Sequence, residues 1–277
     1  MLRLSLALSL AVSAAVPASL LAASALLTAC EKKGLTPEEQ AAKNKEDLSN
    51  GAARVREEKY AEAEPMFARV LAVEPENAEA LAGMGRTKLG QKKYDEAAAL
   101  LERAAAKLPD DGPIQASLGE VYGKQDRHVE SAAAYGAAFK ADPNNGNLGI
   151  AQSHALIKAK QLDQAEQVLR EVVKVDPQAE YVYTDLGDTL RLQGKLDESL
   201  KSYMKALIEH VGDKKAHAGA AQVYELQDNK AKAIDEWSTY IRMDCCSEFA
   251  NTVAKPSIAK LQDTKAEPAP PADKAAG

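Results

Sequence analysis

Four histidines, three cysteines and one glycine-rich stretch are the parts of this chain whose residue types could support chemistry. The histidines show no His-Glu-x-x-His arrangement and no metal-ligand spacing with cysteine. Residues 83–91 have glycines spaced as in a phosphate-binding loop, but Gln91 stands where lysine should follow, and no strand pattern precedes them. No Gly-x-Ser-x-Gly motif occurs. The sequence therefore predicts no enzyme, no metal site and no cofactor.

Cys245 and Cys246 are neighbours in the sequence. Adjacent cysteines can close only a strained ring, so we do not expect a simple disulfide between them. The favoured interpretation is a pair of small buried side chains. A disulfide to a partner chain is the second hypothesis, and a vicinal redox switch is the third.

Cys30 stands at the end of an apolar segment rich in alanine and leucine. Arg3 precedes this segment and no acidic residue occurs before Glu31, which is typical of a secretory signal covering residues 1–29. The final tetrapeptide, residues 27–30, is similar to the bacterial lipobox, in which the cysteine is acylated and becomes the new N-terminus. That resemblance implies lipidation at Cys30, with an ordinary cleaved signal or an uncleaved anchor as the alternatives. Glu31, where an aspartate would retain a lipoprotein in the inner membrane, favours the outer membrane facing the periplasm.

The charge of the chain argues against nucleic acid as a partner. The net charge is −6, and removal of Arg3 with the signal makes it −7. Phosphate binding requires a positive surface. We therefore expect contact with protein partners, and with a membrane only through acylated Cys30.

Pro75, Pro109, Pro143 and Pro177 lie 34 residues apart, and other positions repeat in register with them. Small residues occur 24 and 12 residues before each proline, and a large apolar residue occurs 8 before it. Two more units continue the frame, with Val211 and Cys245 at the position where the earlier units have proline. A fixed period of this length predicts an array of stacked supersecondary units.

The spacing within a unit predicts two short antiparallel helices joined by a polar turn. Small residues 12 apart would let the two backbones approach closely, and the large residue one turn later would fill the space beside the crossing. Proline would end the second helix. The predicted units are 44–77, 78–111, 112–145, 146–179, 180–213 and 214–247.

The frame resembles the tetratricopeptide repeat family. Leu118-Gly119 with Tyr122, and the Tyr-Asp-Glu-Ala run of residues 94–97, match the signature of that family. The resemblance implies an all-α solenoid of six helix pairs. Residues 30–43 are predicted as a lipid-anchored tether and the start of a helix, with Thr36, Pro37 and Glu39 in capping positions. Residues 248–263 are predicted as a capping helix interrupted near Pro256, and residues 264–277 as a disordered tail.

The family resemblance also implies a partner-binding groove along the first helices of the pairs. In this family, groove residues occupy the second, fifth, ninth, twelfth and thirteenth positions of a unit. The first two-thirds of this predicted groove are mostly basic with an apolar patch, which suits an extended or helical peptide of acidic character. The alternative is that these are ordinary solvated residues and that the convex face or the loops bind partners. The predicted groove residues are Arg56, Arg86, Leu89, Glu120, Lys124, Ile150, His154, Ile157, Lys158, Tyr181, Asp188, Arg191, Gln222 and Glu225.

Three functional hypotheses follow. Six repeats behind a lipobox are similar in architecture to the pilotin lipoproteins of type IV pili, which implies a scaffold for assembling or positioning an envelope machine for piliation, motility or secretion. The second hypothesis is an adaptor that recruits cell-wall hydrolases or proteases. The third is a redox accessory protein that uses Cys245 and Cys246.

Overall fold

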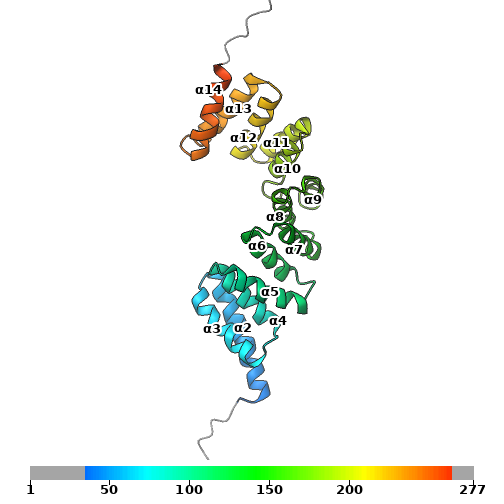
Figure 1. Cartoon of the computed structure of the whole chain (residues 1–277), viewed down its shortest axis with the longest axis vertical. Helices are drawn as coiled ribbons and strands as arrows, with labels where there is room; N and C mark the ends of the chain where they lie inside the picture. The colour runs from blue at the N-terminus through cyan, green and yellow to red at the C-terminus, as the bar shows by residue number, and fades with distance from the viewer. Residues whose placement is uncertain (1–34, 264–277) are drawn as a thin grey trace, which may run out of the picture. The chain divides into compact units, whose positions relative to one another are not determined.

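The computed structural model of the chain describes residues 35–263. The predicted signal, Cys30, the first part of the tether and the tail lie outside the described residues. Within the described residues the protein is an all-α solenoid of six helix pairs followed by a C-terminal cap, as predicted (Figure 1). The pairs are α2 (Pro37–Arg56) with α3 (Tyr60–Val73), α4 (Ala78–Gly90) with α5 (Tyr94–Lys107), α6 (Gly112–Lys124) with α7 (His128–Ala141), α8 (Gly146–Lys158) with α9 (Leu162–Val175), α10 (Val182–Leu192) with α11 (Leu196–Glu209), and α12 (Lys214–Leu226) with α13 (Lys230–Met243).

The contacts divide the chain into a unit of residues 1–45 and a unit of residues 46–277. The described part of the first unit is the start of α2. There the backbone N–H of Thr36 donates to the Glu39 carboxylate at 2.8 Å, and the N–H of Glu39 donates to the Thr36 hydroxyl at 3.2 Å. This reciprocal pair is the predicted capping box, with Pro37 in the first helical position.

Within the second unit, small and large residues meet as the spacing predicted. A Cβ atom added to Gly119 would lie 2.7 Å from the ring of Tyr135, and one added to Gly187 would lie 2.6 Å from the ring of Tyr203. The hydroxyl of Ser131 donates to the carbonyl of Gly119 at 2.7 Å, so the small positions 12 residues apart do face each other. The large side chain therefore lies directly over the glycine of the partner helix.

The turn inside each pair has the same backbone geometry in all six units. One turn residue per unit has a positive φ between 54° and 77°. Only one of these six is glycine, so five L-residues hold a left-handed conformation that local preference disfavours. Packing between the helices therefore imposes the left-handed turn at the five positions where the sequence has no glycine. The six residues are Glu58, Lys92, Asp126, Lys160, Gly194 and Asp228.

The C-terminal cap consists of a π-helical turn, η2 (Ala250–Ala254), which leads directly into α14 (Lys255–Gln262). Pro256 lies in the first turn of α14, where η2 passes directly into that helix, so the predicted interruption takes the form of a change from π-helical to α-helical geometry. Ala250 and Ala254 are fully buried against Trp237 and Tyr240 of α13. The cap thus covers the apolar face that the last helix pair would otherwise expose.

Candidate functional site

The first helices of successive pairs contact one another as well as their own partners, from α4 through α6, α8 and α10 to α12. The predicted groove residues of α4, α6 and α8 lie along this shared face. Two adjoining cavities open there, and Glu120 and Lys124 line both of them. The structure therefore brings together Arg86, Leu89, Glu120, Lys124, His154 and Lys158.

The first cavity has a volume of about 360 Å³ and lies among α2 to α6. Arg86 is held across it by a hydrogen bond of 3.0 Å from its Nε to the hydroxyl of Ser117. Burial lowers the pKa of the Arg86 guanidinium, which shows that its charge is partly removed from water. The lining residues are Val55, Tyr60, Arg86, Leu89, Gly90, Lys92, Tyr94, Ser117, Glu120 and Lys124.

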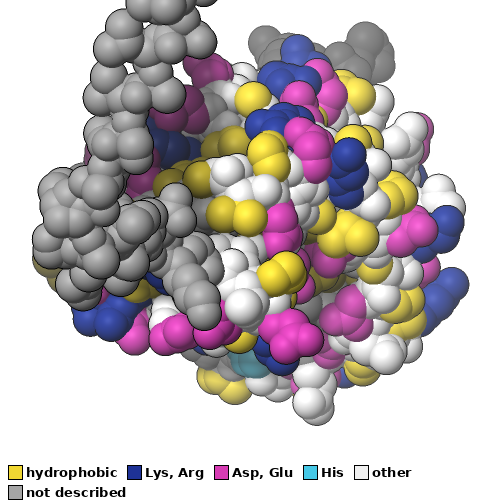
Figure 2. All heavy atoms as spheres, turned by 90° about the horizontal axis from the view of Figure 1, so that it is seen from below, with side chains coloured by type: hydrophobic (Ala, Val, Ile, Leu, Met, Phe, Trp, Pro, Cys, Tyr) yellow, Lys and Arg dark blue, Asp and Glu magenta, His cyan; other side chains and the backbone are white. Residues whose placement is uncertain are grey.

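Cationic side chains without ion-pair partners dominate this cavity. Arg86, Lys92 and Lys124 form no ion pair with any carboxylate in residues 35–263, and Glu120 is the single acidic residue of the lining. The face drawn in Figure 2 is a mosaic of both signs. Glu120 in the lining and the charge of Asp111, which acts on Arg86, offset this cluster only in part. The remaining excess of positive charge on an acidic protein would attract a carboxylate-bearing partner.

The second cavity, of about 240 Å³, lies among α6, α7 and α8. Lys124 and Lys158 line it, and Lys158 also has no ion-pair partner within the described residues. His154, on the same cavity, is hydrogen-bonded through Nε2 to the Asp185 carboxylate at 2.9 Å. This hydrogen bond raises the pKa of His154 above its usual value, against the opposing effects of burial and of the charges of Lys215 and Lys158. Burial, with the charge of Glu120 second, raises the pKa of Tyr135 to about 12, so its hydroxyl stays neutral.

Other predicted groove residues lie elsewhere. Ile150 is buried among Phe139 and the apolar side chains of the neighbouring pair, so it is part of the core and cannot contact a partner. Ile157 is half-buried against the core between α7 and α9. Arg56 is exposed at the end of α2 and does not line the first cavity. Tyr181 precedes α10 in a left-handed conformation, so helical spacing does not describe its position.

The last four predicted groove residues make contacts within the array. Asp188 accepts a hydrogen bond of 2.7 Å from the Tyr203 hydroxyl and pairs with Arg191 at 3.4 Å. Glu225 accepts a hydrogen bond from the indole N–H of Trp237. Gln222 is half-buried and lines a separate cavity with Asp188 and Arg191. Three of these four side chains therefore already have partners of their own.

The positional rule missed residues from the turns and second helices that line the two basic cavities. Tyr60 and Tyr94 begin α3 and α5, and Lys92 occupies the left-handed turn between α4 and α5. Tyr135 reaches the second cavity from α7, above Gly119. The repeat could have pointed to the two tyrosines of the first cavity, because Tyr60 and Tyr94 occupy the same position of successive units.

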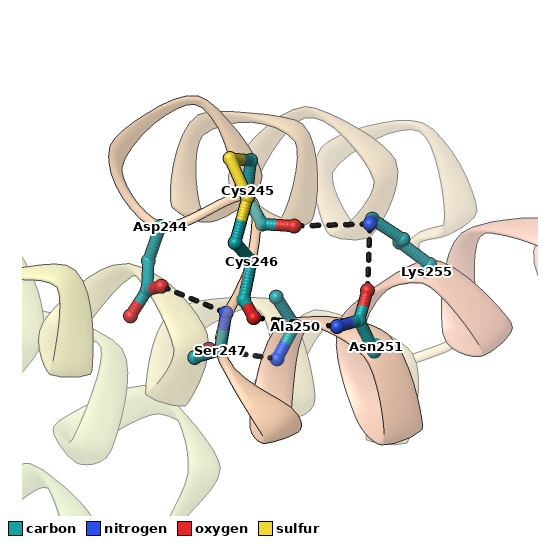
Figure 3. Close-up of a disulfide and its surroundings, with 7 residues drawn as sticks. All are labelled: Asp244, Cys245, Cys246, Ser247, Ala250, Asn251 and Lys255. Atoms are coloured by element: carbon teal, nitrogen blue, oxygen red, sulfur yellow. Dashed lines mark hydrogen bonds between the residues drawn. A yellow bond between two sulfur atoms is a disulfide. The ribbon is translucent and has the colours of Figure 1, made fainter.

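The expectation for Cys245 and Cys246 is wrong on both counts. The structure joins the two residues by a disulfide, and both are exposed (Figure 3). They follow the end of α13, where the backbone bends through residues 245–247 and is free of helical constraint. The argument from ring strain did not allow for a bond at a bend outside helical structure.

The described residues contain no group of three or more histidine, cysteine or acidic side chains placed to hold a metal ion. None of the helices in residues 35–263 is both long enough and apolar enough to cross a membrane.

Comparison with known families identifies the fold. A tetratricopeptide repeat model matches residues 54–120 and 124–184, and a second model of the same description matches residues 181–207. The chain belongs to the tetratricopeptide repeat family. No curated protein sequence matches this tetratricopeptide repeat protein significantly.

Solved structures of other tetratricopeptide repeat proteins share its fold. A protein from Parabacteroides merdae aligns with a TM-score of 0.64 at 16% identity, covering 79% of this chain and 87% of its own. PilF of Pseudomonas aeruginosa aligns with a TM-score of 0.62 at 12% identity, covering 82% of this chain and 99% of its own. YrrB, described as having an unusual peptide-binding site, aligns with a TM-score of 0.58 at 20% identity, covering 68% of this chain and 97% of its own.

Proposed function

We propose that this protein is a lipid-anchored scaffold of the bacterial envelope, whose two basic cavities bind an acidic segment of a partner protein. Arg86, Lys92, Lys124 and Lys158, gathered on one face without ion-pair partners in the described chain, are the observation that carries the proposal. A peptide that crosses both cavities would place its carboxylates against these cations and its apolar side chains against Leu89.

The proposed location rests on the lipobox-like residues 27–30, with Cys30 acylated and the repeat array held close to the outer membrane on its periplasmic side. Acyl chains stabilise membrane attachment by about 0.8 kcal/mol per buried methylene, so several chains together make a lasting anchor. The fold shared with PilF makes pilus assembly the first envelope machine to test, followed by motility and secretion complexes.

The test of the partner uses in-cell photo-crosslinking of the full-length protein with a photoreactive amino acid in place of Leu89. Arg86→Glu and Lys158→Glu are introduced separately, and Lys201→Glu on α11 is the matched control, because Lys201 is exposed and far from both cavities in the repeat. One dominant channel or motility component that is lost in the two cavity variants and kept in the control supports the proposal. A spread of cell-wall hydrolases or proteases would replace it by the adaptor hypothesis.

The test of the anchor is membrane fractionation with labelled palmitate. Cys30→Ser should abolish labelling and release the protein from the membrane, whereas Cys246→Ser should retain both. If Cys30→Ser stays in the membrane, or is still labelled, the lipid anchor is contradicted. Neither result affects the proposal for the cavities.

A further inference from the structure

A third cavity lies at the C-terminal end of the array and shares no lining residue with the two basic cavities. Its volume is about 450 Å³, and α10, α12, α13 and the turn before η2 enclose it. The lining residues are Asp188, Arg191, Lys214, Lys215, Ala218, Gly219, Gln222, Tyr240, Asp244, Ser247 and Phe249.

The floor and one wall of this cavity are apolar. Ala218 and Gly219 present almost no side chain, and a Cβ atom on Gly219 would meet the Tyr203 ring at 2.3 Å. Tyr240 and Phe249 stand edge to face, with ring centroids 5.4 Å apart. Phe249 remains 38% exposed although it packs on the fully buried Trp237, so one side of its ring faces solvent. An incoming aromatic ring would find both an edge and a face to pack against.

The rim carries one positive charge in excess. Lys214 pairs with Asp244 at 2.6 Å, and Arg191 pairs with Asp188 at 3.4 Å. Lys215 has no carboxylate partner within residues 35–263, and its ammonium lies 5.4 Å from the centre of the Tyr181 ring. A carboxylate would therefore be attracted to the Lys215 side of the cavity.

The disulfide lies in the part of the rim between the end of α13 and Phe249. Cys245 and Cys246 lie between two lining residues, Asp244 and Ser247 (Figure 3). The N–H of Ser247 donates to the Asp244 carboxylate at 3.2 Å, and the Lys255 ammonium donates to the carbonyl of Cys245 at 3.0 Å. A rim ordered before binding loses less conformational entropy when a partner is bound.

We infer that this cavity is a second docking site, which takes an aromatic side chain next to a carboxylate on an extended segment of a partner protein. The ring enters against Tyr240 and Phe249, and the carboxylate pairs with Lys215. The inference goes beyond the proposed scaffold function and rests on lining residues that neither basic cavity shares.

The experiment measures binding of a fluorescein-labelled, capped peptide, Gly-Asp-Phe-Asp-Gly, to the full-length protein in detergent micelles by fluorescence anisotropy. Replacing the phenylalanine of the peptide by alanine should weaken binding about three- to tenfold, the range that one aromatic contact provides. Replacing both aspartates by asparagine should weaken it similarly. Equal affinity for the three peptides would overturn the inference.

Protein variants locate the site. Phe249→Ala and Lys215→Gln should each weaken binding of the phenylalanine peptide, whereas Lys201→Gln should not. Lys215 is exposed, so its variant keeps the test decisive if Phe249→Ala disturbs the cap. Loss of binding in the double variant Arg86→Glu with Lys124→Glu, with binding retained in Lys215→Gln, would assign the peptide to the basic cavities and overturn the inference. Unchanged binding by Lys215→Gln would also overturn the inference.

Discussion

At the scale of single residues, the recurring contact of this array joins a small residue to a large apolar side chain, and in three units these are glycine and an aromatic ring. Gly119 has no room for a side chain, because the Tyr135 ring occupies the space where its Cβ atom would lie. The ring is itself half-buried and also lines the second cavity. The two residues therefore have to be explained together, as one packing unit.

We predict that Gly119→Leu destabilises the protein by about 1–3 kcal/mol, because the new side chain must push the Tyr135 ring and the two helices apart. Thermal or urea unfolding of the purified protein measures this change. Gly212→Ala is the control, since no atom lies within 4 Å of the position where its Cβ would be, and it should change stability by less than about 0.5 kcal/mol. Equal effects of the two substitutions would contradict the packing argument.

The pair of His154 and Asp185 predicts a pH dependence. The hydrogen bond to Asp185 raises the pKa of His154, although burial and the charges of Lys215 and Lys158 lower it. Because the pKa is higher in the folded protein, the stabilisation is fully present below about pH 6.5 and is lost as the pH rises through the folded-state pKa.

NMR titration should therefore find the pKa of His154 above 6.5 in the native protein and lower in Asp185→Asn. The difference in melting temperature between the two proteins should be larger at pH 5.5 than at pH 8. A difference that grows with pH would show that the sign of this linkage is wrong.

At the scale of helices, a glutamine that ends the first helix of a pair joins neighbouring pairs. The side-chain amide of this glutamine donates to an aspartate in the first turn of the second helix of the preceding pair. The bonds are Gln125 to Asp95 at 2.7 Å, Gln193 to Asp163 at 2.8 Å and Gln227 to Asp197 at 3.0 Å. The junction between the third and fourth pairs lacks this bond. Ala159 stands at the glutamine position and Val129 at the aspartate position, where Val129 is 57% exposed.

We predict that Val129→Asp combined with Ala159→Gln restores the missing bond and stabilises the protein by about 0.5–1 kcal/mol. Each single substitution should contribute little, because the bond needs both partners. A double-mutant cycle in urea unfolding isolates the coupling, with Asp95→Ala and Gln125→Ala as the matching cycle at an existing bond. A coupling energy of zero at the restored junction, beside a clear one at the existing junction, would refute the prediction.

Helix ends show how far the sequence determined the fold and where packing took over. The four prolines predicted the ends of α3, α5, α7 and α9, each of which stops two residues before its proline. However, α11 and α13 end at the same place in the frame, before Val211 and Cys245. The repeat period, set by contacts between neighbouring pairs, thus fixes the ends even where the local signal is missing.

The candidate site was less predictable than the fold for a related reason. A rule that counts positions along a helix finds Arg86, Lys124 and Lys158, because all three lie within first helices, Lys124 and Lys158 as their last residues. It fails for Tyr181, which lies outside its helix, and for Ile150, which the neighbouring pair buries. Burial and turn geometry depend on contacts between units, so the sequence of a single unit does not predict them.

At the scale of the whole molecule, an array of repeats has two ends whose apolar faces need covering, because each pair buries its surface only against its neighbours. In the C-terminal cap, Val253, Ile258 and Leu261 pack on the core around Trp237 and Tyr240. Trp237 is fully buried and is the single tryptophan of the chain, so its fluorescence reports on this end alone.

We predict that a chain ending at Ser247 loses roughly 2–5 kcal/mol of stability, since it removes the cap and exposes the aromatic face of α13. Its tryptophan emission should shift to longer wavelength at temperatures where the full chain remains folded. A chain ending at Asp263 keeps every cap contact described above and should behave as the full chain does.

Because repeat arrays unfold from weak ends, the chain ending at Ser247 should also lose hydrogen-exchange protection first in α12 and α13, and later in α4 to α6. Uniform loss along the array would instead mean that the six pairs unfold as one cooperative unit.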